Sequence, residues 1–315
     1  MQKIIVGVSS CLLGHEVRYD GSHKRNDYIL QTLGRYFEFR PFCPELESGL
    51  GVPRPTIHLL ETEKGIRCVA VKDHNDDKTE LLQACSARQD DWLQTLSGYL
   101  LKKDSPSCGM ERVKVYRSNN QPPHKIGVGL FVQHLQEKFP LLPIEEEGRL
   151  GNPVLRENFI QRVYIFHRWR HLLEQPPAPR VLTEFHARHK LICMSHDQNL
   201  ARNLGRVAAS ADKNNIQEVI QQYGIDLMHC LKKTATRGNH TNVLQHIQGY
   251  LKTTLSSDDK AEMSETIEQY RLGYVPLIVP ITLLKHHFRK APDPFIQNSY
   301  YLTPYPSELA ILNDI

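Results

Sequence analysis

Short apolar runs alternate with amphipathic segments through the first half of the chain. The predicted strands are runs rich in β-branched and aromatic residues: KIIVGVSS (3–10), FEFRPFCP (37–44), IHLLET (57–62) and IRCVAV (66–71). The predicted helices have apolar residues at helical spacing and cover 27–37, 77–103 and the end of 125–139, which begins as a strand or turn. Strands that alternate with helices predict a Rossmann-like α/β domain with a mainly parallel sheet, whose ligands bind beyond the carboxyl ends of the strands.

The pattern changes after a boundary segment of prolines, glutamates and glycines at 140–154. Beyond this boundary, apolar residues recur every three or four positions in 152–175, 180–210, 216–233, 240–255 and 256–275. The 180–210 segment predicts a pair of helices, and SSDDKAEM (256–263) has a capping serine followed by acids in the first turn. We therefore expect two domains, an α/β domain over 1–148 and an all-α domain over 155–315.

Composition is that of a globular protein, with 315 residues, 40% hydrophobic and 23% charged. No apolar run approaches the roughly 18 residues of a membrane span, and the first residues lack the basic opening of a secretory signal. These features predict a cytoplasmic protein with no membrane partner. The whole net charge of +4 lies in residues 153–315, and this mild excess favours a solvated surface over a nucleic-acid-binding stripe.

The seven cysteines are an odd number in a chain without an export signal, so thiols or metal ligands are expected rather than a disulfide framework. Cys11, Cys43 and Cys108 lie in turns rich in Gly, Pro or Ser, where parallel strand topology can bring distant loops to one edge. The other four lie within regular, partly apolar segments and are expected to be packing residues: Cys68, Cys85, Cys193 and Cys230.

Three thiolates are an informative number of ligands. A structural zinc site has four protein ligands, whereas an iron–sulfur cubane held by three cysteines has one iron open to a substrate atom. The spacing alone does not distinguish iron from zinc, and three separate thiols remain the alternative.

The segments SSCLLGHEVRYDGSHKRN, FCPELESGLGVPRP and KKDSPSCG resemble the three motifs of the thiouracil desulfidase (TudS) family over roughly residues 1–145. The resemblance implies a [4Fe-4S] cluster held by Cys11, Cys43 and Cys108, with one open iron that acts as a Lewis acid. It also implies a non-redox replacement of the sulfur of 4-thiouracil by oxygen, with release of sulfide. Glu45 matches the catalytic glutamate, and Ser105 matches a serine that assists proton movement or holds the substrate.

The surroundings of the third cysteine suggest how its loop works. Proline is expected to fix the turn, Ser105 and Ser107 to face the pocket, and Gly109 to let the backbone pass close to the cluster. Hydrogen bonding to its own backbone is the alternative role for Ser107.

The predicted substrate is a small thiolated nucleobase or nucleotide, which needs a hold on its ribose or phosphate. The polar residues nearest the cysteine loops are Arg18, Tyr19, Asp20 and Arg54. An arginine can grip phosphate through two hydrogen bonds, although each of these residues can equally be a salt-bridge partner within a loop. Lys102 and Lys103 could serve the same purpose, and the alternative for them is a charge pair at a helix C-terminus that favours the helix dipole.

The second half resembles the YbgA-like domain of unknown function through FHARHKLICMSH, RGNHTNVLQHIQGYLK and the segment 274–306. Its histidines lack an HExxH or carboxylate-rich arrangement, so packing or surface positions are favoured over a metal site. The fusion suggests two hypotheses for this domain, a weak contact with RNA or an oligomer interface.

Two other classes of function are compatible with the sequence. One is an iron–sulfur redox or sulfur-transfer enzyme that modifies RNA or nucleotides, and the other is a non-catalytic binding module whose cysteines only pack a core. Activity without a reductant separates the desulfidase from the redox enzyme, and an iron-free protein would favour the binding module.

Overall fold

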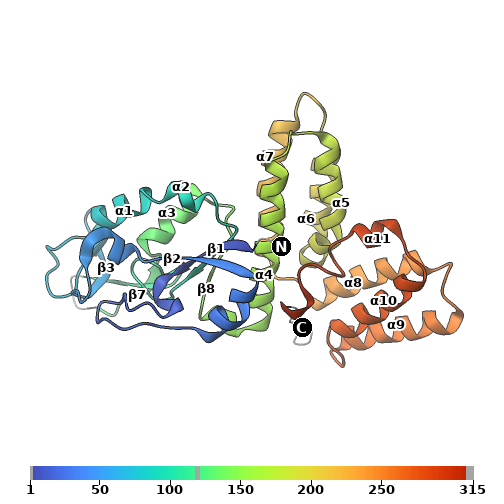
Figure 1. Ribbon diagram of the computed structural model, residues 1–315, viewed down its shortest axis with the longest axis horizontal. Coiled ribbons are helices and arrows are strands. Elements are labelled where there is room, and N and C mark those ends of the chain that lie inside the picture. The colour runs from blue at the N-terminus through green and yellow to red at the C-terminus, as the bar shows by residue number, and fades with distance from the viewer. Residues whose placement is uncertain (1–2, 118–120, 310–315) are drawn as a thin grey trace. The chain divides into compact units, whose positions relative to one another are not determined.

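The computed structural model describes residues 3–117 and 121–309 (Figure 1). The predicted domains also include residues 1–2, 118–120 and 310–315, which lie outside the described residues. The chain separates into two compact units, residues 1–151 and 152–315. None of the helices in the described part of the chain is long and apolar enough to cross a lipid bilayer.

A parallel sheet of four strands organises the N-terminal unit. Its members are β1 (Ile4–Ser9), β2 (Phe37–Phe42), β5 (Tyr99–Leu101) and β8 (Ile144–Glu146), in the order β2-β1-β5-β8. All three neighbouring pairs are parallel, and β1 lies in the middle with four of its six residues buried in succession. A strand covered on both faces is apolar at successive positions, which explains the continuous run in the sequence. The predicted α/β class with a parallel sheet is confirmed.

The predicted long helix over 77–103 is wrong beyond its first half. The segment forms α1 (Thr79–Ala87), the short α2 (Asp90–Leu93) and then the strand β5. Every residue of β5 is buried between β1 and β8, so its three apolar side chains do not form one face of a helix. The predicted helix over 27–37 is replaced by two short turns, a π turn at Tyr28–Thr32 and a 3-10 turn at Leu33–Arg35.

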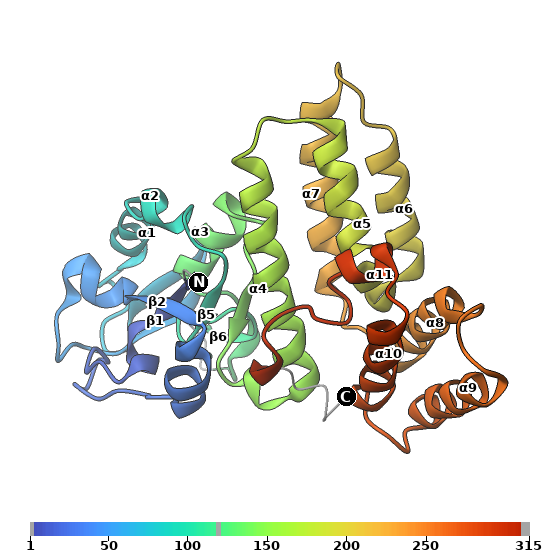
Figure 2. The same ribbon diagram turned by 45° about the vertical axis from the view of Figure 1, so that its right-hand side comes forward.

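A second sheet contains the other predicted strands. Its order is β4-β3-β6-β7, and its members are β3 (Ile57–Thr62), β4 (Gly65–Ala70), β6 (Val113–Tyr116) and β7 (His124–Gly127). β3 and β4 form an antiparallel hairpin, so they do not extend the parallel sheet as expected. β7 leads into α3 (Leu130–Lys138), which confirms the predicted strand or turn followed by a helix. The helices α1, α2 and α3 lie on the same side of the N-terminal unit (Figure 2).

The described part of the C-terminal unit is helical, as predicted (Figure 1). Its helices are α4 (Pro153–Leu173), α5 (Pro179–His196), α6 (Gln198–Ala209), α7 (Ile216–Lys232), α8 (Arg237–Gln248), α9 (Ser257–Leu272), α10 (Ile278–Lys290) and α11 (Pro294–Asn298). The predicted pair at 180–210 is α5 and α6, which meet at Asp197, whose carboxylate accepts the amide protons of Asn199 and Leu200. The expected capped start is a full capping box between Ser256 and Asp259.

Aromatic packing and helix-to-helix contacts hold the second unit together. The Trp169 ring of α4 lies 5.3 Å from the Phe185 ring of α5 and 5.6 Å from the Tyr223 ring of α7. Gly224 makes this approach possible, because a Cβ at that position would lie 2.8 Å from Trp169. The helices α5, α6 and α7 run side by side (Figure 2).

Candidate active site

Three neighbouring strands of the parallel sheet each lead into a cysteine. Cys43 follows β2 directly, Cys11 lies in the 3-10 turn after β1, and Cys108 lies in the loop after β5. Since β2, β1 and β5 are adjacent and parallel, their carboxyl ends meet at one edge of the sheet. All three cysteines line one pocket there, with a volume of about 350 Å³. The strand before Cys108 is β5, not the long helix expected from the sequence.

The three thiols share an environment that disfavours their own negative charge. Burial raises the pKa of the Cys11 thiol to about 11, with a further contribution from Cys43. Burial likewise raises the pKa of Cys43, and burial and the neighbouring Cys43 raise that of Cys108. A cationic centre in this pocket would compensate the charge of the thiolates, so its binding would release their protons.

The donor set of the pocket includes three thiols, which suit an iron–sulfur cluster chemically. Within residues 3–117 and 121–309, no group of three His, Cys, Asp or Glu side chains is arranged to hold one metal ion. A cubane places its irons at separate corners, so each thiolate binds its own iron and the thiols need not converge on one point. Thiolates are also the soft ligands typical of such clusters. The three cysteines therefore fit a cluster with three protein ligands.

Ser105 holds the loop that carries Cys108. Its hydroxyl oxygen accepts the amide protons of Ser107 at 3.3 Å and of Cys108 at 3.1 Å, and its carbonyl accepts that of Gly109 at 2.8 Å. A Cβ at Gly109 would lie 2.3 Å from the side chain of Val113 and 2.8 Å from the Ser105 carbonyl oxygen. Glycine is therefore required at position 109 because a side chain would collide with Val113 and the Ser105 backbone. From the sequence, the expected reason for this glycine was a close approach of the backbone to the cluster.

The first turn of α3 supports the same loop from behind. The amides of Leu130 and Phe131 donate to the carbonyl oxygens of Pro106 at 3.1 Å and Ser107 at 3.0 Å. A Cβ at Gly129 would lie 2.5 Å from the carbonyl group of Ser107. The backbone of the loop thus rests directly on the start of the helix, which fixes the position of Cys108.

Glu45 lies in the same pocket, two residues past Cys43. Its Oε1 accepts the hydroxyl proton of Ser107 at 2.6 Å, and its Oε2 accepts two N–H groups of Arg54 at 2.7 and 3.0 Å. The Ser105 and Ser107 hydroxyl oxygens are 3.0 Å apart. A carboxylate only accepts, so Ser107 donates to Glu45 and Ser105 donates to Ser107. The two serines and the carboxylate form one hydrogen-bonded chain.

The structure separates the predicted substrate-binding residues into three groups. Arg18 and Tyr19 line the pocket. Asp20 is exposed outside the pocket lining, and its carboxylate accepts the amide and hydroxyl protons of Ser22 at 3.1 and 2.6 Å. Those hydrogen bonds hold the pKa of Asp20 below its usual range. Arg54 and Ser107 line the pocket, but the side chains of both bind Glu45. Arg54 is therefore a salt-bridge partner within the loops, the second of the two roles that the sequence left open.

Ser9 and Lys24 are two side chains of the pocket that were not assigned from the sequence. Ser9 accepts the amide proton of Lys102 at 3.0 Å and hydrogen-bonds the Cys108 thiol, which favours the thiolate. Lys24 lines the pocket together with Lys102 and Lys103, and Lys102 pairs with Glu147 at 2.5 Å. Lys102 and Lys103 follow the strand β5, so the predicted alternative of a charge pair at a helix C-terminus is wrong. Ser9 and Lys24 lie in the same segment as Cys11, SSCLLGHEVRYDGSHKRN. This closeness to Cys11 along the chain was the only feature of the sequence that could have pointed to them. The remaining four cysteines are buried within β4, α1, α5 and α7.

Two family models match the chain. Residues 6–147 match the model described as 2-thiouracil desulfurase, and residues 190–306 match the model described as a protein of unknown function, DUF1722. The uncharacterized protein YbgA of Escherichia coli (strain K12) is 30% identical over 146 residues, which are 46% of this chain and 86% of that protein. The uncharacterized protein YbbK of Bacillus subtilis (strain 168) is 32% identical over 108 residues, 32% of this chain and 71% of that protein.

One solved structure is also similar in sequence. It is described as the [4Fe-4S]-dependent thiouracil desulfidase TudS and is 30% identical, and the match covers 48% of this chain and 94% of that chain. The TM-score of this comparison is 0.38.

Proposed function

The chain belongs to the 2-thiouracil desulfurase family in its N-terminal part and to the YbgA family, of unknown function, in its C-terminal part, and from this we propose that it is an iron–sulfur-dependent desulfidase. The proposed reaction replaces the sulfur of 4-thiouracil or 4-thiouridine monophosphate by the oxygen of water and releases sulfide, with no net oxidation or reduction. The observation that carries the proposal is the meeting of three thiols, two of them buried and that of Cys43 half-buried, with one carboxylate in a single pocket at the sheet edge.

Cys11, Cys43 and Cys108 would hold a [4Fe-4S] cluster through three thiolates. When bound, such a cluster with one iron free of protein ligands supplies a Lewis acid that prefers the soft sulfur of a thiocarbonyl. Ser9 and the loop of Ser105 hold the Cys108 side of this ligand set in place.

Glu45 is the proposed acid and base of the reaction. The carboxylate takes one proton from the attacking water and gives it to the departing sulfur, and the second proton of the water is released when the carbonyl forms, so the residue ends each turnover as it began. Its Oε1 is the oxygen that faces the serines, since Oε2 is held by Arg54. Ser107 and Ser105 extend this acceptor by two hydroxyl groups, through which a proton can move by successive transfer along hydrogen bonds.

Arg18 and Tyr19 are the proposed contacts for the sugar or phosphate of a nucleotide substrate. Both line the pocket, where Lys24 and Lys103 add positive charge. An anionic phosphate is attracted to such a rim. Asp20, which lies outside the pocket lining, would act only by holding this loop in shape.

We assign desulfurisation to the predicted domain 1–148 and keep the contact with RNA and the oligomer interface as hypotheses for the helical domain 155–315. The proposed enzyme is a cytoplasmic hydrolase. Electrophoretic mobility of an RNA with and without the full chain, and light scattering of the full chain, would test the two hypotheses separately.

The test of the function uses the full chain purified without oxygen. Iron and acid-labile sulfide are measured first, and then the loss of thiocarbonyl absorbance is followed with 4-thiouracil and with 4-thiouridine monophosphate, without a reductant. We expect about four irons per chain and turnover of at least one substrate. Glu45→Ala should abolish turnover and keep the iron. Turnover only with an electron donor would instead favour the redox enzyme, and an iron-free protein would contradict the proposal.

A further inference from the structure

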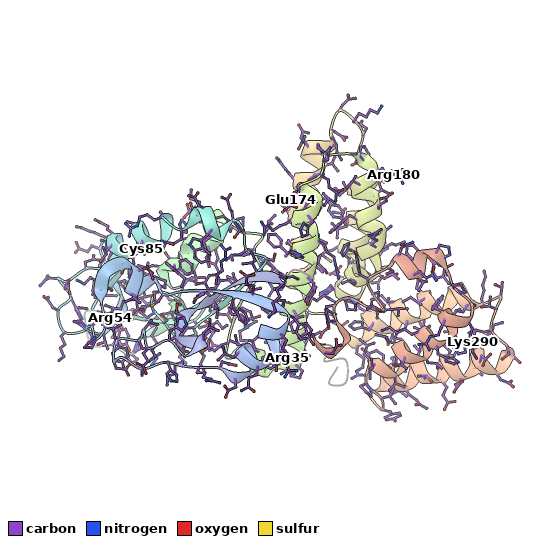
Figure 3. The ribbon with its side chains drawn as sticks, viewed as in Figure 1. Arg35, Arg54, Cys85, Glu174, Arg180 and Lys290 are labelled. Atoms are coloured by element: carbon purple, nitrogen blue, oxygen red, sulfur yellow. The ribbon has the colours of Figure 1, made fainter. Side chains whose placement is uncertain are left out.

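Arg54 is almost entirely buried, and its side chain is only 3% exposed. Its Nε and Nη2 donate to Glu45 Oε2, its Nη1 donates to the carbonyl oxygen of Gly51 at 2.9 Å, and its Nη2 also donates to that of Val17 at 3.0 Å. All three nitrogens of the guanidinium are therefore bound by the protein itself. Arg54 is labelled among the side chains of the N-terminal unit in Figure 3.

The partners of Arg54 come from different cysteine loops. Val17 follows Cys11 in the loop after β1, whereas Glu45 and Gly51 follow Cys43 in the loop after β2. The other oxygen of Glu45 binds Ser107, the neighbour of Cys108 in the third loop. One guanidinium and one carboxylate thus connect all three loops that carry the thiols.

We propose that Arg54 is a positioning residue, which joins the three cysteine loops and fixes the orientation of the Glu45 carboxylate. The inference rests on the proposed function only for the catalytic role of Glu45. An arginine suits this place because its planar fork presents several donors in a rigid arrangement, and a carboxylate bound by two of them cannot rotate freely. The remaining donors reach the two backbone carbonyls without disturbing this pair. A lysine ammonium has a different shape and cannot make the same set of contacts.

The contacts also oppose the role expected from the sequence, a grip on the substrate phosphate. A phosphate would have to displace Glu45 or a backbone carbonyl from Arg54, and a displaced Glu45 would lose its fixed orientation. The two roles make different kinetic predictions, because 4-thiouracil has no phosphate and 4-thiouridine monophosphate has one.

The experiment compares Arg54→Met and Arg54→Lys in the full chain with the wild type. Arg117→Met is the matched control, since Arg117 pairs with Glu61 in the second sheet and does not line the pocket. The measurements are kcat and KM on both substrates, iron per chain after anaerobic reconstitution, and hydrogen exchange of the amides at 17–21 and 45–51 in the cluster-free protein.

For Arg54→Met we expect kcat to fall roughly 100-fold on both substrates, as a displacement of about 1 Å does at a catalytic group, with KM changed less than threefold. The amides of both loops should exchange faster, and Arg54→Lys should recover only part of either loss. An increase of KM confined to the nucleotide would show that Arg54 holds phosphate and overturn the proposal, as would unchanged kcat and exchange.

A double variant, Glu45→Gln with Arg54→Met, guards against a loss that comes only from a buried, unpaired carboxylate. Removing both charges should restore part of the slow exchange relative to Arg54→Met alone. If the wild type acts on neither substrate, the proposed function fails, but the exchange data still decide whether Arg54 joins the loops. Equal exchange in the wild type and Arg54→Met would then refute the inference by itself.

Discussion

Replacing Gly129 with alanine tests whether the start of α3 sets the position of Cys108. The new Cβ would lie 2.5 Å from the Ser107 carbonyl group and 2.8 Å from the Cys108 amide nitrogen, whereas ordinary contact begins at 3.4 Å. The neighbours are backbone atoms, so the loop must move by about 0.9 Å, the difference between 3.4 and 2.5 Å. Gly129 has a φ of −64°, which alanine adopts freely, so the effect comes from crowding alone.

Crowding of this kind costs about 1–3 kcal/mol of unfolding free energy in a well-packed interior. For a unit of this size, a loss of about 2 kcal/mol lowers the unfolding temperature by roughly 4–8 °C. A shift of nearly 1 Å in the Cys108 loop should also reduce iron retention and lower kcat by up to about 100-fold.

The assay is calorimetric unfolding of the full chain, followed by iron per chain after anaerobic reconstitution. Gly238→Ala is the control, because no atom lies within 4 Å of the added Cβ there and the residue lies in α8. We expect the control to unfold at or slightly above the wild-type temperature, since alanine favours helix. A Gly129→Ala protein that unfolds with the wild type and retains all its iron would refute the argument that this contact positions Cys108.

Ser107→Ala should lower kcat more than Ser105→Ala does, because Ser107 donates directly to Glu45. Steady-state kinetics of both variants at equal iron loading measure this effect. Equal kcat in Ser107→Ala and the wild type would contradict it. The C-terminal unit should lose stability as the pH falls below 6.5, because burial lowers the pKa of His189 and His240 to about 3 and that of His196 to about 4. Below the ordinary pKa of 6.5 the unfolded chain binds protons that the folded chain does not, which costs up to about 1.4 kcal/mol per pH unit for each histidine. Above pH 6.5 these residues are neutral in both states and have no effect. Denaturant unfolding at several values of pH measures the slope of the unfolding free energy against pH. His189→Leu should reduce this slope by the contribution of one histidine. An unchanged slope would show that His189 is protonated in the folded state.

Local patterns in the sequence determined much of the fold. The apolar run of β1 requires burial on both faces, and the helical spacing over 152–175 requires an amphipathic helix, so both elements could be predicted from nearest neighbours in the chain. The capping box at Ser256 and Asp259 is equally local, since its two partners are three residues apart. The three cysteine loops could also be chosen in advance, because Gly, Pro and Ser mark turns and parallel strands direct such turns to one edge.

The tertiary structure decided what depends on contacts between distant residues. The short strand β5 continues the helical spacing of 77–103 in the sequence, and it is a strand because β1 and β8 pair with its two edges. Ser105 and Ser107 are both serines of the same short turn, so residue type does not distinguish their roles. In the structure it is Ser107 that donates to Glu45, which lies 62 residues earlier in the chain. Arg54 could hold a phosphate or a carboxylate by its chemistry, and the fold gives it Glu45 as a partner. Side-chain partners across loops are set by the packing of the whole unit, and that packing has no local pattern in the sequence.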